Sequence, residues 1–286
     1  MIVKNNSKFK IDEFITNYKL LITNHGFNNG GLIEMVKYTD NEMMAISAGR
    51  FIKDNDIVFA GTGISMLAAT VAKRIYAPKA VVFFETGGID PSLEEVPMAV
   101  SDSRVMSGTC LNSGLIEAFS IAGHRRLRTI AFLGAAQIDK YGNLNTTVIG
   151  DYHKPKIRFS GSGGACDVAS LASAVITFMQ HEKRRFVEKL DYLTSVGWYR
   201  GGDSRKKIGL QRGGAFAVVT NLCVMKFDEE TKEMYLAEYY SGVSIDKIIG
   251  NTGFTIDVSR AIEALPPSPE ELRILREEVD PQKLML

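Results

Sequence analysis

The chain has 286 residues, of which 45% are hydrophobic and 23% are charged, and its formal net charge at pH 7 is +1. These totals are typical of a soluble globular protein with a substantial core. They exclude binding to nucleic acid or to an anionic membrane through a strong overall charge. The three cysteines, Cys110, Cys166 and Cys223, form no CxxC pair, so we expect reduced thiols, a cytoplasmic location and no metal site. No apolar run reaches the ~20 residues that a membrane span requires.

Residues 1–36 differ in pattern from the rest of the chain. The stretch IDEFITNYKLLI predicts a short amphipathic helix, and the stretch NHGFNNGG that follows is rich in turn residues. We therefore expect residues 1–36 to be an N-terminal extension and residues 37–286 to form the main domain.

From Thr39 onward, helical and strand patterns alternate. Helices are predicted at 39–52 (TDNEMMAISAGRFI), 65–77 (SMLAATVAKRIYA), 166–173 (CDVASLAS) and 268–281 (SPEELRILREEVDP), and strands at 56–61 (DIVFAG), 80–84 (AVVFF), 128–139 (RTIAFLGAAQID) and 174–179 (AVITFM). The last helix has an N-cap serine, Ser268, with Pro269 at the first helical position and Glu271 completing a capping box. Strands that are apolar on both faces and separated by helices predict an α/β fold, with a mainly parallel sheet covered by helices on both sides.

Ligands of such sheets bind in the loops beyond the carboxyl ends of the strands. Four loops rich in glycine or asparagine are expected at that edge: GTG at 61–63, ETGG at 85–88, DKYGNLN at 139–145 and SGSGGA at 160–165. Backbone N–H groups in such loops can approach a ligand closely.

One interpretation of the first loop is dinucleotide binding by an NAD-dependent oxidoreductase. A strand leads into Gly61 and Gly63, and an acidic residue, Glu85, ends the next strand, as in a Rossmann unit. The position of the third glycine is occupied by Met66, which weakens this interpretation. Glu85 can also be read as a solvated strand end whose carboxylate caps the turn that follows.

Many segments in order, from about Thr39 to Pro281, resemble the β subunit of glutaconate CoA-transferase, a class I CoA-transferase. They are GTGISMLAATVAKRIYAP, the ETGG turn, GAAQIDKYGNLN, TTVIGDYHKPKIRFSGSGGA, QHEKRRF, DYLTS with GW, and NTGF. The resemblance does not extend to residues 1–36. It implies that Glu85 is a covalent nucleophile, with Thr86 in place of the serine or asparagine usual in the family and Gly87 next to it.

The resemblance also implies roles for the other loops. Gly163 and Gly164 would supply backbone donors to an oxyanion or to CoA, and Asn145 would hold the glutamate or the thioester carbonyl by its amide. Gly61 and Gly63 would line the same site. Gly87 and Gly88, after Glu85, would let the backbone pack tightly there and would give the thioester room to approach. For each of these residues, an ordinary turn or helix start without a ligand is the alternative.

This chemistry suits a site without a recognisable Ser/His/Asp triad. A carboxylate is already ionised at neutral pH, so it attacks a thioester without a general base and forms a covalent glutamyl-CoA thioester. The substrates are then an acyl-CoA and a free carboxylic acid, glutaconate-like, with coenzyme A as part of the substrate and no separate cofactor. An acyl-CoA hydrolase or decarboxylase is the alternative on the same fold, and a degenerate subunit that only binds is a further one.

The resemblance implies a partner as well. Transferases of this family have an α and a β half, and the G-G-F-type loop of the α half is not evident in this chain. We therefore expect a hetero-oligomer with an α subunit and a site at the interface. The basic run HEKRR at 181–185 is either a contact for CoA phosphates or, more simply, a solvated surface.

Overall fold

The structure is a computed structural model, and it describes residues 37–61, 63–93 and 96–286. The chain divides into two compact units, Met1–Lys37 and Tyr38–Leu286, of which only the second is described below. The predicted N-terminal extension and its amphipathic helix lie outside the described residues.

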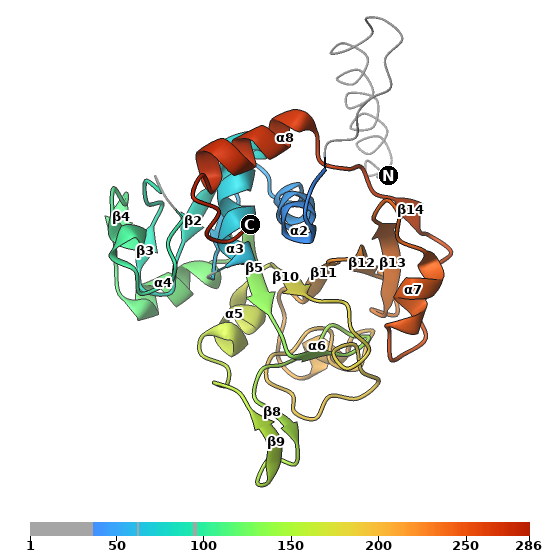
Figure 1. Cartoon of the computed structure of the whole chain (residues 1–286). Coiled ribbons are helices and arrows are strands. Elements are labelled where there is room, and N and C mark those ends of the chain that lie inside the picture. Colours follow the sequence, from blue (N-terminus) through green and yellow to red (C-terminus); the bar gives the residue numbers. More distant parts are fainter. Residues whose placement is uncertain (1–36, 62, 94–95) are drawn as a thin grey trace, which may run out of the picture. The chain divides into compact units, whose positions relative to one another are not determined.

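A ten-stranded sheet forms the centre of the second unit, in the order β14-β13-β12-β11-β10-β5-β1-β2-β3-β4 (Figure 1). Strands β2, β1, β5, β10 and β11 are parallel neighbours, and antiparallel strands extend the sheet on both sides. The strands are β1 (Ile57–Phe59), β2 (Val81–Phe83), β3 (Gly88–Ile89), β4 (Leu111–Asn112), β5 (Thr129–Gly134), β10 (Ala174–Met179), β11 (Ala215–Thr220), β12 (Cys223–Phe227), β13 (Met234–Tyr239) and β14 (Ile262–Glu263).

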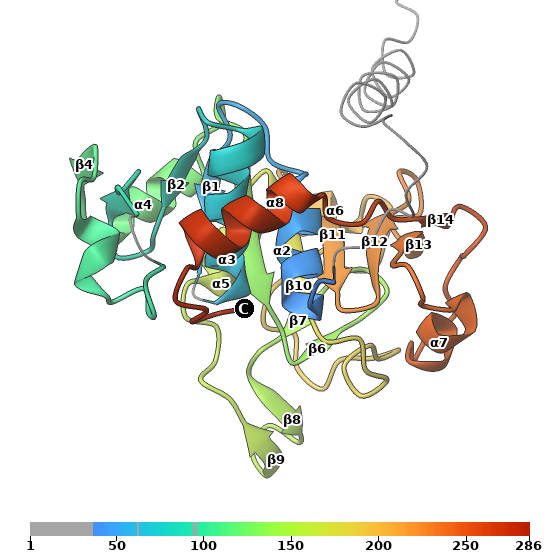
Figure 2. The same cartoon turned by 45° about the horizontal axis from the view of Figure 1, so that its top comes forward.

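Helices cover both faces of this sheet. On one face lie α2 (Asp40–Gly49), α3 (Ile64–Val71) with the π-helix Ala72–Tyr76, and α8 (Pro269–Ile274) with the π-helix Leu275–Val279 (Figure 2). On the other face lie α4 (Leu115–Ala122), α5 (Ala165–Leu171) and α7 (Ile245–Gly250). Two further short helices among the described residues are the 3-10 helix Ser103–Met106 and α6 (Ser204–Lys207). Side chains along each strand alternate between two cores, so Val58 packs in one and Phe59 in the other.

The predicted fold class is confirmed, and each predicted strand in the parallel part of the sheet is present. The predicted cap of α8 is also confirmed, because Ser268 and Glu271 form the capping box and Pro269 opens the helix. The sequence analysis did not identify α4, the parallel strand β11, the antiparallel strands β12 and β13, or the hairpin of β8 (Val148–Gly150) and β9 (Pro155–Arg158). No described helix is both long enough and apolar enough to cross a bilayer.

One of the four expected edge loops lies elsewhere. Residues 139–143 join β6 (Gln137–Ile138) to β7 (Leu144–Asn145), and this hairpin lies across the second face because Ile138 and Leu144 are buried in its core. A Cβ built on Gly142 would lie 2.4 Å from the Cβ of Ala215, at the amino end of β11. The prediction that this whole loop lines the carboxyl edge is therefore wrong, since burial of its apolar residues draws the tip to the opposite edge.

A buried histidine closes the second core beyond β10. His181 is 4% exposed, its ring stacks on Phe186 at 4.2 Å, and its Nε2 lies 3.0 Å from Oγ1 of Thr252. Its Nδ1 lies 3.3 Å from Oγ1 of Thr220. Burial lowers the pKa of His181 from 6.5 to about 4, so the imidazole is neutral in the folded protein at neutral pH.

Because the pKa of His181 is lowered in the folded protein, we expect the free energy of unfolding to depend on pH. Between pH 6.5 and 4 the unfolded chain binds a proton at His181 that the folded chain does not. The contribution of the neutral imidazole to the free energy of unfolding is therefore fully present above pH 6.5. It is lost as the pH falls to 4, which lowers the free energy of unfolding by up to about 3 kcal/mol. Urea unfolding across this range should show a shallower loss of stability in His181→Gln than in the wild type. His153→Gln, the same change at an exposed histidine, is the control. If the free energy of unfolding changed with pH equally steeply in the wild type and in His181→Gln, this prediction would be contradicted.

Candidate functional site

Glu85 stands at the carboxyl end of β2, immediately after two fully buried aromatic residues. Phe83 and Phe84 are both 0% exposed, and they fix the strand end in the sheet. Glu85 is half-buried and lies within a turn closed by a hydrogen bond from the Gly87 N–H to the Phe84 carbonyl, at 3.0 Å. A rigid strand end thus presents the carboxylate at the edge where α/β proteins bind ligands.

The carboxylate of Glu85 lies against the backbone of Gly164. A Cβ built on Gly164 would lie 2.9 Å from Oε2 of Glu85 and 2.4 Å from Cζ of Phe119. The predicted nucleophile and one of the predicted donor glycines, 79 positions apart in the sequence, are therefore neighbours in the fold. In the described part of the chain, no hydrogen bond or ion pair engages the Glu85 carboxylate, so its oxygens remain available to a substrate.

The loop that carries Gly164 has two N–H groups without a hydrogen-bond partner among the described residues. Gly163 has φ +47° and Gly164 has φ −78°, which is the succession of left-handed and right-handed conformations that forms an anion-binding concavity. Neither N–H group donates a hydrogen bond to another described residue. Both are therefore free to stabilise negative charge that develops next to Glu85.

A buried arginine holds the helix that follows this loop. Arg205 is 1% exposed, and its guanidinium donates to the carbonyl of Ala169 in α5 at 2.8 Å. It also donates to the carbonyls of Val196, Gly197 and Arg212 at 2.7 to 3.0 Å. Since α5 begins directly after Gly164, these bonds fix the position of the donor loop relative to the sheet.

Phe119 is the neighbouring side chain that the sequence analysis missed. It comes from α4, which lies beside α5 on the same side of the sheet (Figure 1). Its ring packs on Gly164 and lies near Phe59, with the two ring centroids 6.2 Å apart. The signal in the sequence was the stretch GLIEAFSIAG, whose apolar residues recur at helical spacing between two glycines.

Gly61 and Gly63 lie at the end of β1, the strand next to β2. A Cβ on either residue would meet nothing within 4 Å, so the space above their backbone is open. Met66, where a dinucleotide site would need a glycine, is fully buried in the first core. The buried methionine gives no support to a Rossmann-type helix contact.

The glycines after Glu85 make room for the protein's own backbone. Gly87 has φ +100°, and a Cβ on it would lie 1.9 Å from the carbonyl oxygen of Ser113; a Cβ on Gly88 would lie 2.2 Å from that of Val105. The expected tight packing of backbone at Gly87 and Gly88 is therefore present, whereas the expectation that these glycines leave room for the thioester is wrong, because the protein's own backbone fills that space. Thr86 is exposed, and its hydroxyl donates to the carbonyl of Val100 at 3.1 Å.

Asn145 also differs from the expectation. It is 0% exposed, and its amide nitrogen donates to Oε1 of Gln137 and to the carbonyl of Val148, both at 2.7 Å. Its amide oxygen accepts from the N–H groups of Thr147 and Val148. The side chain thus has no N–H left for a glutamate or a thioester, and it holds the base of the β6–β7 hairpin instead.

The basic run at 181–185 is largely engaged within the chain. His181 is buried, and Glu182 pairs with Arg184 at 2.6 Å and with Arg185 at 3.1 Å. These pairs give no support to the interpretation as a contact for CoA phosphates. Over residues 37–61, 63–93 and 96–286, no group of three histidine, cysteine, aspartate or glutamate side chains could hold a metal ion.

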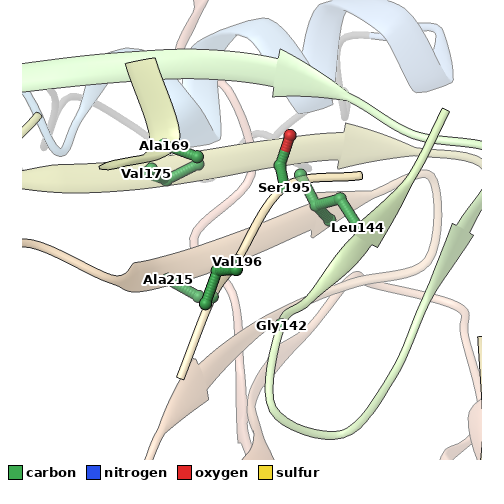
Figure 3. Close-up of a pocket in the computed structure, with 8 residues that line it drawn as sticks. Gly142, Leu144, Ala169, Val175, Ser195, Val196 and Ala215 are labelled. Carbon is green, nitrogen blue, oxygen red and sulfur yellow. The ribbon is translucent and has the colours of Figure 1, made fainter. Parts of the chain in front are cut away.

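A narrow void lies inside the second core, away from Glu85. It is lined by Leu144, Ala169, Val175, Ser195 and Ala215, among others, and has no room for a water molecule (Figure 3). The hydroxyl of Ser195 is buried there without a hydrogen-bond partner among the described residues. We assign this void to imperfect packing beneath β10 and β11, not to substrate binding.

Comparisons with known proteins identify relatives of this chain over most of its length. The model of the coenzyme A transferase family matches residues 41–251. The B subunit of glutaconate CoA-transferase from Acidaminococcus fermentans is 46% identical over 255 residues, which cover 87% of this chain and 96% of that protein. The B subunit of 3-oxoadipate CoA-transferase from Pseudomonas knackmussii is 37% identical, and the match covers 85% of this chain and 94% of that protein.

Solved structures give the same result. The crystal structure of glutaconate coenzyme A-transferase from Acidaminococcus fermentans superposes with a TM-score of 0.84 at 44% identity, covering 87% of this chain and 97% of the other. The decarboxylase AibA/AibB superposes with a TM-score of 0.74 at 22% identity, covering 87% of this chain and 98% of the other, and this likeness shows the shared fold alone.

The close approach of Glu85 and Phe119 to Gly164 allows the effect of a Gly164→Ala substitution on activity to be predicted. Gly164→Ala would place a Cβ within 3 Å of both Glu85 and Phe119, and would therefore displace the carboxylate or the donor loop. We expect CoA transfer by the assembled enzyme to fall by about 10²-fold, the typical effect of a misplacement of about 1 Å. Gly250→Ala, where a Cβ meets nothing within 4 Å, is the matched control. Wild-type transfer rates in Gly164→Ala would exclude this geometry.

Proposed function

The chain belongs to the coenzyme A transferase family, and we propose that it is the subunit that carries the nucleophile of a two-subunit CoA-transferase. The observation that supports this most directly is the position of Glu85, whose carboxylate lies against Gly164 in a loop with two N–H groups that have no described hydrogen-bond partner. The acceptor would be a small dicarboxylic acid, since both transferases that resemble this chain are named for dicarboxylates, glutaconate and 3-oxoadipate.

In the proposed reaction, one carboxylate oxygen of Glu85 attacks the carbonyl carbon of an acyl-CoA. The C–S bond breaks, CoA leaves as the thiolate, and an acyl-glutamyl anhydride remains. The thiolate then attacks the glutamyl carbonyl carbon and the C–O bond breaks, which releases the first acid as its carboxylate and leaves a glutamyl-CoA thioester. A second carboxylate reverses both steps and leaves as the new acyl-CoA, so atoms and charges balance without a redox partner.

Each attack passes through a tetrahedral oxyanion that needs fixed donors. The N–H groups of Gly163 and Gly164 are suited to this role, because their loop approaches the nucleophile at Gly164 and they have no described hydrogen-bond partner. Removing one such donor typically costs ~10²–10³ in rate. Gly61 and Gly63 border the same edge with open space above them, and we assign that space to the thioester.

Water competes with the acceptor acid at every acylated intermediate. Glu85 is only half-buried in this chain, so the chain alone does not exclude solvent from it. The two transferases that resemble this chain are named as B subunits, and two structural relatives, AibA/AibB and IpdAB, are two-component assemblies by name. We therefore propose that an A subunit covers Glu85 and completes the site.

Reductive trapping tests the covalent intermediate. When the complete enzyme is incubated with acyl-CoA in the absence of an acceptor acid, borohydride should reduce the glutamyl thioester to an alcohol and inactivate the enzyme. Labelled borohydride should be incorporated into the wild type and not into Glu85→Gln. If activity survives this treatment and the protein instead binds NADH tightly, the oxidoreductase alternative would replace the transferase.

Shortening the nucleophile tests its reach. Glu85→Asp withdraws the carboxylate by one methylene, so we expect CoA transfer to fall by ~10²-fold. The space opened beside Gly164 should admit water, so that acyl-CoA hydrolysis becomes a larger share of turnover. Glu229→Asp, the same change at an exposed position in the turn after β12, is the control. A Glu85→Asp enzyme with unchanged transfer would count against Glu85 as the nucleophile.

A further inference from the structure

Helix α4 exposes an apolar surface that the rest of the described chain does not cover. Of its apolar residues, Leu115 is 58% exposed and Ile116 is 76% exposed, while Ala118 and Ala122 are buried against the sheet. Leu111, in the neighbouring strand β4, is 54% exposed. Exposed aliphatic side chains gathered in this way are typical of a surface that binds another protein.

This surface adjoins the proposed nucleophile. At 100° per residue, Phe119 lies between Leu115 and Ile116 on the surface of α4, and the ring of Phe119 packs on Gly164 beside Oε2 of Glu85. The segment before α4 is tied to the turn of Glu85 as well, because Ser113 donates its N–H to the carbonyl of Gly87 at 3.0 Å. Anything that covers Leu115 and Ile116 therefore reaches the border of the site.

We propose that the surface of Leu111, Leu115 and Ile116 is where the A subunit docks. This inference rests on the proposed function, and it names the surface of this chain that the partner covers. Strand β4 is the last strand on this side of the described sheet, so β4 and α4 together form one continuous outer edge (Figure 1). A partner seated on it buries aliphatic side chains and, in the same step, removes water from Glu85.

A second copy of this chain fits the surface less well than a different subunit does. A symmetric dimer places the same surface on both sides of a two-fold axis. Because the surface borders Glu85, such a dimer would bring two carboxylates toward one interface and desolvate like charges. A distinct subunit imposes no such pairing, and it also supplies the residues that the site lacks.

The test replaces one exposed aliphatic residue by a charge. Full-length Ile116→Asp is mixed with the A subunit that co-purifies with the wild-type chain, and the dissociation constant is measured by sedimentation. We expect binding about 30-fold weaker, the effect of losing one hot-spot side chain. Ile262→Asp is the matched control, since Ile262 is 64% exposed in β14 at the opposite end of the sheet, and its binding should equal that of the wild type.

Other outcomes overturn the proposal. Equal affinity of Ile116→Asp and the wild type for the A subunit would do so, as would a wild-type homodimer that Ile116→Asp dissociates. The transferase proposal is tested separately on the same samples. If the wild-type complex assembles, Ile116→Asp weakens it and no CoA transfer is detected, the docking surface stands and the proposed function fails.

Discussion

The contact between the Glu85 carboxylate and Gly164 is the constraint on which the candidate site depends. Strand β2 delivers the carboxylate, and α5, held by the buried guanidinium of Arg205, delivers the glycine. The turn after Glu85 is equally fixed, because Gly87 packs against the backbone of Ser113 with no room for a side chain. Three chain segments thus converge on one carboxylate, and the closest approaches at Gly164 and Gly87 tolerate only glycine.

The sequence predicted the parts of this arrangement that are local. Continuous apolar runs identified the parallel strands, since strands buried on both faces carry apolar side chains at nearly every position. Ser268, Pro269 and Glu271 identified the start of α8, because a capping box is formed by residues close in sequence. The apolar run before Glu85 likewise placed Glu85 at a strand end. Its resemblance to the nucleophile of the CoA-transferase family suggested attack on a thioester.

The parts that depend on long-range packing could not be predicted. The sequence around Asn145 does not show that its amide nitrogen donates hydrogen bonds to Gln137 and Val148. These bonds form because the β6–β7 hairpin folds over the sheet. The role of Phe119 is visible only once α4 and α5 lie side by side. Its neighbours Leu115 and Ile116 are exposed in this chain, and under the docking proposal the residues that cover them belong to the A subunit.

The central claim is that one carboxylate, fixed at the end of a buried strand, becomes covalently acylated. It is tested most directly by mass spectrometry of the complete two-subunit enzyme after brief incubation with acyl-CoA. The account predicts a peptide containing Glu85 whose mass is increased by that of CoA less one water, and no such increase in Glu85→Gln. A competent enzyme in which the adduct never forms, or forms on a different residue, would contradict the account.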